Sequence, residues 1–233
     1  MNDNLPQHSV ARYEEEIKGL KDLVLRMAGA VEERVAAVVD AIAESDSQRA
    51  QWVIESDSAI NDLECQVDEM CIGIMARRQP VAIDLRLLIT VLKLTTDLER
   101  IGDETQRIAR VIKRLNFSTT PDEIKQTIRE LGARVIAMLH DAIDSFAHND
   151  VKLSVRTFKQ DKYADQHYKT LVEDQIPEFI HNNTHHIPYI LDLIWCARSL
   201  ERIGDHSKNV AEYVIYMVEA TDVRHRKVKS SSA

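Results

Sequence analysis

The chain has 233 residues and a net charge of −8, with 44% hydrophobic residues, six glycines and five prolines. This length allows one or two domains, and the scarcity of glycine and proline argues against a turn-rich β-protein. The acidic balance argues against nucleic acid as a direct partner. No uncharged apolar run reaches about 18 residues, and the N-terminal segment lacks a signal-peptide core, so the sequence predicts a cytoplasmic protein without direct membrane insertion.

Three helices are predicted in the first half of the chain. The first spans residues 9–43. Ser45 and Gln48 have the spacing of a capping box, which predicts a second helix over 45–78. A third is predicted over 80–115, where apolar residues recur at steps of four and three. These apolar positions are Leu87, Val91, Leu94, Leu98, Ile101, Thr105, Ile108 and Ile112.

Three more helices are predicted in the second half. Thr120 is the expected N-cap of the fourth, with Pro121 at its first position and Glu123 three residues after the cap. The predicted fourth, fifth and sixth helices run to residue 148, from 150 to 182 and from 188 to 220. Pro177 predicts a kink or break within the fifth, because proline removes a backbone donor and crowds the preceding turn.

The sequence LERIGD occurs twice, at residues 98–103 and 200–205, with its glutamates 201 − 99 = 102 positions apart. Asp57 and Asp161 lie at similar places in the middle helices, 161 − 57 = 104 positions apart. The same helix order surrounds both copies, which favours duplication. We therefore predict an all-α fold of two tandem, duplicated three-helix bundles. The expected segments are 1–118, 119–221 and a basic polar tail at 222–233.

Each LERIGD copy places two carboxylates four residues apart on one helix face. Glu99 lies roughly 150° from the centre of its helix's apolar stripe, so this pair is predicted to point away from the core of its bundle. A glycine precedes the aspartate in both copies and weakens the helix by about 1 kcal/mol relative to alanine. Its recurrence predicts the close approach of another group. A charged, solvated face is the simplest alternative to a binding site.

Carboxylate oxygens are hard ligands that suit Mg²⁺, Mn²⁺ and iron, but a metal site needs further donors from an adjacent helix. Asp161 and Asp165 can supply them in the second repeat. The counterparts in the first repeat are Asp57 and Asn61, so an amide replaces one acid and weaker metal binding is expected there. The predicted metal ligands are Asp57, Asn61, Glu99, Asp103, Asp161, Asp165, Glu201 and Asp205.

These motifs resemble the PhoU family of phosphate-transport accessory and phosphate-signalling proteins. The resemblance covers nearly the whole chain and rests on the doubled LERIGD, on RRQPVAIDLRLL at 77–88 and on DHSKNVAEYVIY at 205–216. It implies two similar three-helix bundles, and iron or zinc clusters held by E(D)-x-x-x-D pairs. Seven of the eight predicted ligands match that acidic pattern, and Asn61 departs from it.

The resemblance also implies a regulatory role. Family members restrain the phosphate-starvation response when phosphate is plentiful, through the ATPase subunit of the high-affinity phosphate transporter and a membrane sensor histidine kinase. No nucleophile elbow, P-loop or dinucleotide fingerprint occurs, so no enzymatic activity is expected. Attachment to the inner face of the membrane would then be peripheral and mediated by these partners.

Further expectations concern assembly and competing functions. Leu88, Leu92, Ile190 and Ile194 lie in line with the acidic pairs, which predicts a homodimer through these faces. A ferritin-like metal-carboxylate enzyme is one alternative function, although that chemistry expects Glu-x-x-His pairs facing inward and neither LERIGD copy has them. A metal-free helical scaffold, whose acidic faces bind basic partner surfaces, is the other alternative.

Overall fold

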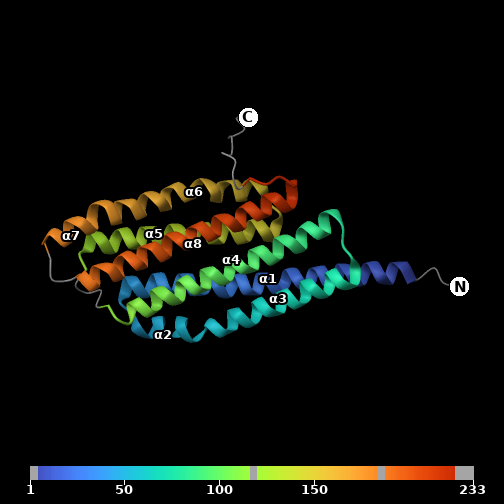
Figure 1. Ribbon diagram of the computed structural model, residues 1–233, viewed down its shortest axis with the longest axis horizontal. Helices are drawn as coiled ribbons and strands as arrows, with labels where there is room; N and C mark the ends of the chain where they lie inside the picture. Colours follow the sequence, from blue (N-terminus) through green and yellow to red (C-terminus); the bar gives the residue numbers. More distant parts are fainter. Residues whose placement is uncertain (1–4, 116–119, 183–186, 224–233) are drawn as a thin grey trace, which may run out of the picture.

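The computed structural model describes residues 5–115, 120–182 and 187–223, and within these ranges helices are joined by short turns without any β-strand. The helices run side by side and antiparallel along one elongated molecule (Figure 1). The predicted all-α fold of two duplicated three-helix bundles is confirmed. None of the described helices is long and apolar enough to cross a membrane.

The first repeat contains α1 (Leu5–Glu44), α2 (Ser47–Glu55), α3 (Asp57–Arg78) and α4 (Ala82–Ile112). The predicted second helix is therefore divided into α2 and α3 at Ser56. The predicted cap at Ser45 is wrong, because Ser45 adopts a left-handed conformation with φ 57° as α1 ends. The next residue, Asp46, caps α2 instead, and its carboxylate accepts hydrogen bonds from the backbone N–H groups of Gln48 and Arg49.

The second repeat contains α5 (Asp122–His148), α6 (Val151–Lys169), η2 (Thr170–Gln175), α7 (Ile176–Asn182) and α8 (Ile187–Glu219). The predicted irregularity at Pro177 is confirmed, because the chain forms a turn of π-helix, η2, immediately before it. The predicted cap of α5 is one residue early, since Pro121 takes the N-cap position. The Thr120 hydroxyl instead hydrogen-bonds the Tyr189 hydroxyl.

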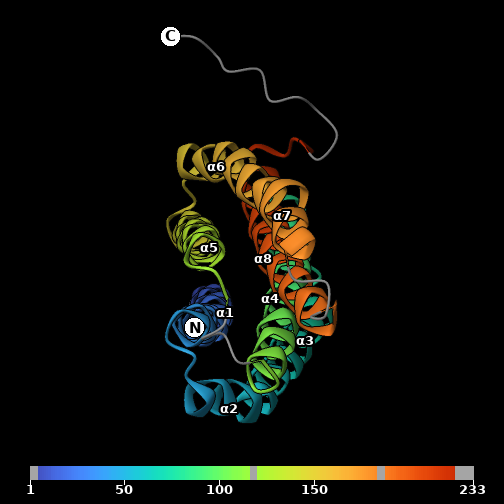
Figure 2. The ribbon, with the colours of Figure 1, turned by 90° about the vertical axis from the view of Figure 1, so that its left-hand side faces the viewer.

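The two repeats share one continuous hydrophobic core. All eight positions of the predicted apolar stripe on α4 are buried. The most extensive packing between any two helices joins α4 to α8, and α1 also packs against α5. Seen along the molecule, α4 and α8 lie next to each other, with α1 and α5 beside them (Figure 2). The repeats therefore pack against each other through two helix pairs.

Three polar contacts fix the register of the antiparallel helices α4 and α8. The pairs are Arg114–Asp192 at 2.8 Å, Glu104–Arg202 at 3.1 Å and Asp97–Asn209 at 3.1 Å. In each pair the residue numbers sum to 306, which is also the sum of 102 and 204. Gly102 and Gly204 are therefore level with each other, and the two LERIGD copies pass one another along this seam.

The surface predicted for a homodimer is not available. Leu88 and Ile190 are buried within the chain, 0% and 3% exposed, and Leu92 and Ile194 pack against the same core. The prediction treated each bundle alone, but the extensive contact between α4 and α8 buries faces that a separate bundle would expose. Dimerisation itself stays a prediction without an assigned surface.

Candidate functional site

The second repeat brings together four carboxylates that the sequence singled out, and we name them the second cluster: Asp161, Asp165, Glu201 and Asp205. The first two are on α6 and the others on α8, which pack against each other. Two effects raise the pKa of Asp165: desolvation is the larger, and the negative charge of the neighbouring Asp161 is the second. The same two causes in the same order raise the pKa of Asp205. The carboxylates therefore lie close enough for their negative charges to repel.

Glu201 is the most enclosed member of the LERIGD carboxylate pairs, with a side chain only 12% exposed. Burial is the largest cause of its raised pKa, and the negative charges of Asp205, Asp165 and Asp161 raise the pKa further. Its Oε1 accepts a hydrogen bond from Arg198 at 2.7 Å, but its buried Oε2 has no partner in the described part of the chain. The predicted outward orientation is therefore wrong for Glu201, which lies between the helices with one acceptor unused.

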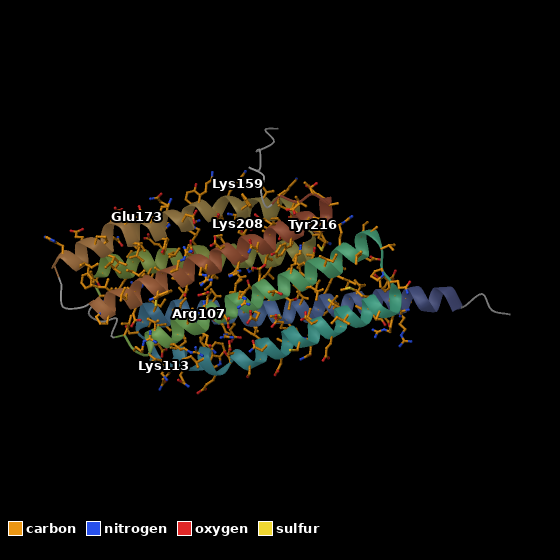
Figure 3. All side chains as sticks on the ribbon, viewed as in Figure 1. Arg107, Lys113, Lys159, Glu173, Lys208 and Tyr216 are labelled. Atoms are coloured by element: carbon orange, nitrogen blue, oxygen red, sulfur yellow. The ribbon has the colours of Figure 1, made fainter. Side chains whose placement is uncertain are left out.

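Two cations at the edge of the second cluster offset part of this charge. The Lys208 ammonium donates to Asp161 Oδ2 at 2.5 Å. Lys208 lies midway along α8 (Figure 3), and its Nζ is also 4.8 Å from the centre of the Phe158 ring. Arg198 supplies the second cation. Lys169 also acts to lower the pKa of Asp165. Four carboxylates against these three cations still leave a negative surplus at neutral pH.

The first repeat has a corresponding group on α3 and α4, which we name the first cluster: Glu64, Asp68, Glu99 and Asp103. Burial, and next Asp103, raises the pKa of Glu99. Burial, and next Glu99, raises the pKa of Glu64, with further contributions from Asp68 and Asp103. Arg100 bridges the LERIGD pair, with contacts of 3.5 Å to Glu99 and 3.6 Å to Asp103. This bridge has no counterpart in the second repeat, where Arg202 turns to Glu104.

Asp57 and Asn61 have other surroundings than those predicted. Asp57 lies near enough to influence Glu99, but its Oδ1 accepts a 2.9 Å hydrogen bond from Arg34 on α1. Arg34 is 1% exposed, and its Nη2 also donates to the Gly102 carbonyl at 3.3 Å. Asn61 is exposed on α3. Asp57 is thus the counterion of a buried arginine.

Sequence reasoning missed Glu64 and Asp68, although they too are four residues apart on one helix. They align with the α6 pair at a different offset, 161 − 64 = 97 and 165 − 68 = 97. LERIGD repeats at an offset of 102, so the second repeat has five more residues between its middle and last helices. The segment containing η2 and α7 follows the α6 pair. Aligning the middle helices separately would have found the missed pair.

The two LERIGD glycines differ in how closely other groups approach them. A Cβ at Gly102 would lie 3.3 Å from Ile60 Cδ1 and 3.7 Å from Arg34 Nη1. At Gly204 the nearest atoms, from Met138 and Val135, would be 3.7 Å away, which is ordinary contact. The predicted close approach is therefore confirmed for Gly102, where Ile60 Cδ1 makes it, and not for Gly204.

The donor chemistry of the second cluster fits a hard cation. Carboxylate oxygens are the preferred donors for such ions, and the unpartnered Oε2 of Glu201 is one that a cation could use. In the conformation described here, no three His, Cys, Asp or Glu side chains of the described residues are grouped closely enough to hold a metal. A bound ion would therefore require these side chains to rotate toward one another.

The fold and its two acidic clusters define a class of duplicated three-helix-bundle proteins with paired carboxylates at matching places. The PhoU domain model matches the chain twice, at residues 24–112 and 128–214. The chain belongs to the PhoU family, as the sequence motifs predicted.

Individual relatives agree with this assignment. The chain is 40% identical to the phosphate-specific transport system accessory protein PhoU homolog of Pseudomonas aeruginosa, over 96% of this chain and 92% of the relative. It is 37% identical to the PhoU protein of Escherichia coli, over 95% and 91% of the two chains. The crystal structure of PhoU from Pseudomonas aeruginosa superposes with a TM-score of 0.86, covering 90% of this chain and all of that one.

Proposed function

We propose that this chain is a cytoplasmic regulatory adaptor of a phosphate transport system, which represses the phosphate-starvation response when phosphate is plentiful. The supporting observation is the match along nearly the whole chain to relatives that are named phosphate transport accessory proteins. Its proposed partners are the transporter's ATPase subunit and a sensor histidine kinase. We further propose that it acts by binding these partners and not by catalysis.

The second part of the proposal is that a metal ion binds at the second cluster. Its four carboxylates carry more negative charge than the nearby cations balance. Burial, and next the repulsion between the carboxylates, raises the pKa values of Asp165, Glu201 and Asp205, and a di- or trivalent cation would remove that repulsion. Iron or zinc is the expected ion, with manganese or magnesium as alternatives. Asp161 would exchange its ion pair with Lys208 for the metal.

The first cluster is proposed to bind metal more weakly. Arg100 already bridges Glu99 and Asp103, and Arg34 engages Asp57. The sequence predicted the same order of affinity from Asn61 alone, but these two arginines give the structural reason. Ligands for this weaker site would come from Glu64 and Asp68 in addition to the LERIGD pair.

A gene deletion tests the regulatory proposal. Removing the chain should raise expression of a phosphate-starvation reporter in phosphate-rich medium, because the repressing adaptor is lost. Complementation with the wild-type chain should restore repression. If neither reporter expression nor phosphate uptake changes in the deletion strain, the regulatory proposal is wrong.

Calorimetry with Fe, Zn, Mn and Mg tests the metal proposal on chelator-treated protein without a histidine tag. Wild type should bind an ion, because the second cluster supplies several carboxylate oxygens and a surplus of negative charge. The variant Glu201→Ala/Asp205→Ala should lose the tighter site, and the matched variant Glu99→Ala/Asp103→Ala should keep it. Circular dichroism controls for folding. Absence of binding by wild type would favour the metal-free scaffold.

A further inference from the structure

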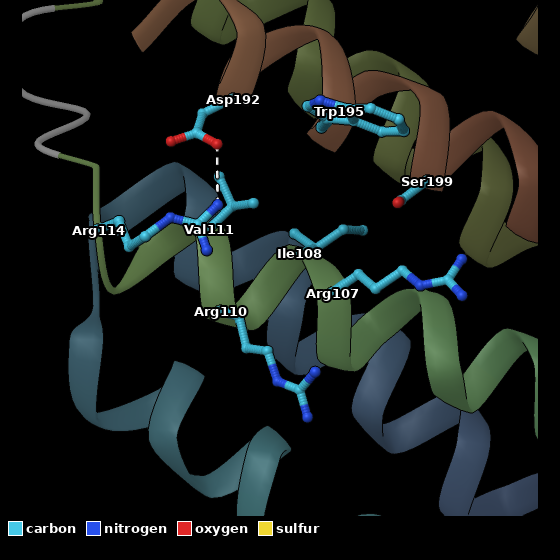
Figure 4. A pocket seen from close by; sticks show the side chains of 8 residues that line it. All are labelled: Arg107, Ile108, Arg110, Val111, Arg114, Asp192, Trp195 and Ser199. Atoms are coloured by element: carbon cyan, nitrogen blue, oxygen red, sulfur yellow. Dashed lines mark hydrogen bonds and ion pairs between the residues drawn. The ribbon is translucent and has the colours of Figure 1, made fainter. Parts of the chain in front are cut away.

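A groove lies between α4 and α8 at the end of the seam away from Tyr216, with a volume of about 300 Å³. We name it the arginine groove after Arg107 and Arg110 of α4 and Arg114 in the turn that follows α4, all of which line it. Trp195 and Asp192 line the opposite side from α8 (Figure 4). Both repeats contribute to it, so it exists only in the assembled pair of bundles.

The arginine groove carries a surplus of positive charge on a chain whose net charge is −8. Arg114 pairs with Asp192 at 2.8 Å, and Arg107 pairs with Glu104 at 2.6 Å, yet their side chains remain 59% and 51% exposed. Arg110 is exposed and has no ion-pair partner among the residues that the structure describes. An anionic group could therefore approach Arg110 directly, and it could reach the exposed parts of Arg107 and Arg114 while their ion pairs stay in place.

The same groove exposes apolar surface. Trp195, which lines the groove, is 62% exposed. Leu191 lies one turn earlier on α8, outside the groove lining, and is 50% exposed. Tryptophan and arginine are the side chains most enriched at the energetic centres of protein interfaces. A small inorganic anion would use the arginines but would leave the tryptophan and leucine in water. A ligand that satisfies the whole surface must be both anionic and apolar.

The duplication shows that the fold does not require this composition. At the 102-residue offset, Arg107, Arg110 and Arg114 correspond to Asn209, Glu212 and Tyr216, and Trp195 corresponds to Lys93. Arg107 and Tyr216 lie toward opposite ends of the α4–α8 seam (Figure 3). In that equivalent region Lys93 Nζ sits 5.8 Å and 5.9 Å from the ring centres of Tyr213 and Tyr216.

The difference between the two repeats also argues against helix stabilisation as the only reason for the arginines. Cations in the last turns of a helix stabilise its dipole, which could account for arginines at the end of α4. The equivalent stretch of α8, residues 209–216, has no cation and still forms a helix. Helix formation alone therefore does not account for the arginines and Trp195.

We propose that the arginine groove binds an acidic segment of a partner protein, with a bulky apolar side chain of that segment packed against Trp195 and Leu191. The positive charge of the groove favours a protein segment rich in Asp or Glu. The exposed Trp195 and Leu191 favour a segment that also has a bulky apolar side chain to pack against them. The inference rests on the proposed function only for the identity of the protein that contains this acidic segment, which we take to be the transporter's ATPase subunit.

Two probes separate this inference from the proposed function. The first is the purified ATPase subunit, whose affinity is measured by biolayer interferometry against immobilised full-length chain. The second is a short synthetic peptide rich in Glu and Leu, titrated while the fluorescence of Trp195 is followed in a Trp52→Phe background. Trp52 and Trp195 are the two tryptophans of the chain, so the signal then reports on the groove alone.

Arg110→Glu should weaken the binding of both probes at least about tenfold, and Arg110→Lys should retain binding. Trp195→Ala removes the fluorescent reporter, so it is tested with the ATPase subunit, whose binding should weaken by the same factor. Added salt should weaken the wild-type interaction. Matched controls are Arg26→Glu, which makes the same charge change at an exposed site on α1, and Trp52→Ala, which removes the exposed tryptophan of α2. Both should bind as wild type does.

Each other outcome has a defined meaning. If the peptide binds in a way that depends on the groove residues but the ATPase subunit does not bind, the groove is a binding site for acidic segments, and its assignment to the ATPase subunit is wrong. ATPase binding that Arg110→Glu and Trp195→Ala leave unchanged would overturn the groove and leave the proposed function standing. Saturable quenching of Trp195 by inorganic phosphate alone, without response to the peptide, would overturn the protein partner in favour of a small-anion site.

Discussion

The two LERIGD copies differ most in what lies beneath their glycines. Arg34 passes under Gly102 in the first repeat, and Met138 lies under Gly204 at the equivalent position, 138 − 34 = 104. Both side chains are buried. The arginine is balanced by Asp57, and at the 97-residue offset of the middle helices that acid corresponds to the buried Ser154. One repeat therefore has an ion pair where the other has an apolar and a small polar residue.

This comparison teaches that the duplicated scaffold fixes the positions of the carboxylates but not their electrostatic surroundings. In the first cluster, arginines on α1 and α4 bind acidic residues around LERIGD. In the second repeat the described atoms nearest to Gly204 belong to Met138 and Val135, and Lys208 and Arg198 act from the edge of the second cluster. This difference is the reason for which we propose the second cluster, and not the first, as the tighter cation site.

The largest expected effect comes from placing the first repeat's arginine in the second. Met138→Arg buries a guanidinium where Ser154 replaces the carboxylate, and an unbalanced buried charge costs about 3–5 kcal/mol. Urea unfolding should show a loss of stability of that order. Met138→Leu, which keeps the volume, should change stability by less than about 1.5 kcal/mol. Equal stability of Met138→Arg and wild type would contradict the assigned difference between the repeats.

The reverse exchange should have a smaller effect. Arg34→Met removes the partner of Asp57 and should cost about 2 kcal/mol, less than for a fully buried pair because the Asp57 side chain is 21% exposed. Arg34→Met/Asp57→Ser reproduces the second repeat's pair and should recover much of that loss. A double-mutant cycle measures the coupling, expected at about 1–3 kcal/mol. A coupling near zero would mean that Arg34 and Asp57 stabilise the chain independently.

The helix order, the duplication and the buried stripe of α4 could be predicted from the sequence, because they follow from local periodicity and breakers. Glu64 and Asp68 could not be found with one constant offset, because the second repeat is longer between its middle and last helices. The role of Arg34 was also hidden, since its burial depends on where α1 meets α4. The buried state of Leu88 depends similarly on packing across the chain, which no single-helix pattern reports.

Replacing each LERIGD glycine with alanine tests the difference between the two repeats, with an expected effect on stability of about 1 kcal/mol. Gly204→Ala should stabilise the chain by up to about 1 kcal/mol through helix propensity, because its new methyl meets only ordinary contacts. Gly102→Ala should gain less, because Ile60 Cδ1 would be 3.3 Å from the new atom and must move. Thermal unfolding should separate the variants by roughly 2–4 °C. Equal gains would show that Ile60 moves without cost.

The smallest effect concerns the charge on Glu201. Its pKa is raised by burial and then by Asp205, so the folded state favours the protonated form and ionisation at neutral pH costs stability. Glu201→Gln, measured without metal, should therefore raise the melting temperature at neutral pH by a few degrees. The gain should shrink as the pH falls through the raised pKa and vanish below the unfolded-state pKa, where wild type is also protonated.

Melting curves of both proteins between neutral and acidic pH measure this difference. Arg198→Gln serves as a control for the loss of the Arg198–Glu201 hydrogen bond, since removing this cation should lower stability at neutral pH. A stabilisation by Glu201→Gln that is independent of pH would show that packing causes it, and not charge. A destabilisation at neutral pH would show that the contact with Arg198 outweighs the burial and repulsion of the carboxylate, which would remove the electrostatic basis for placing a cation at the second cluster.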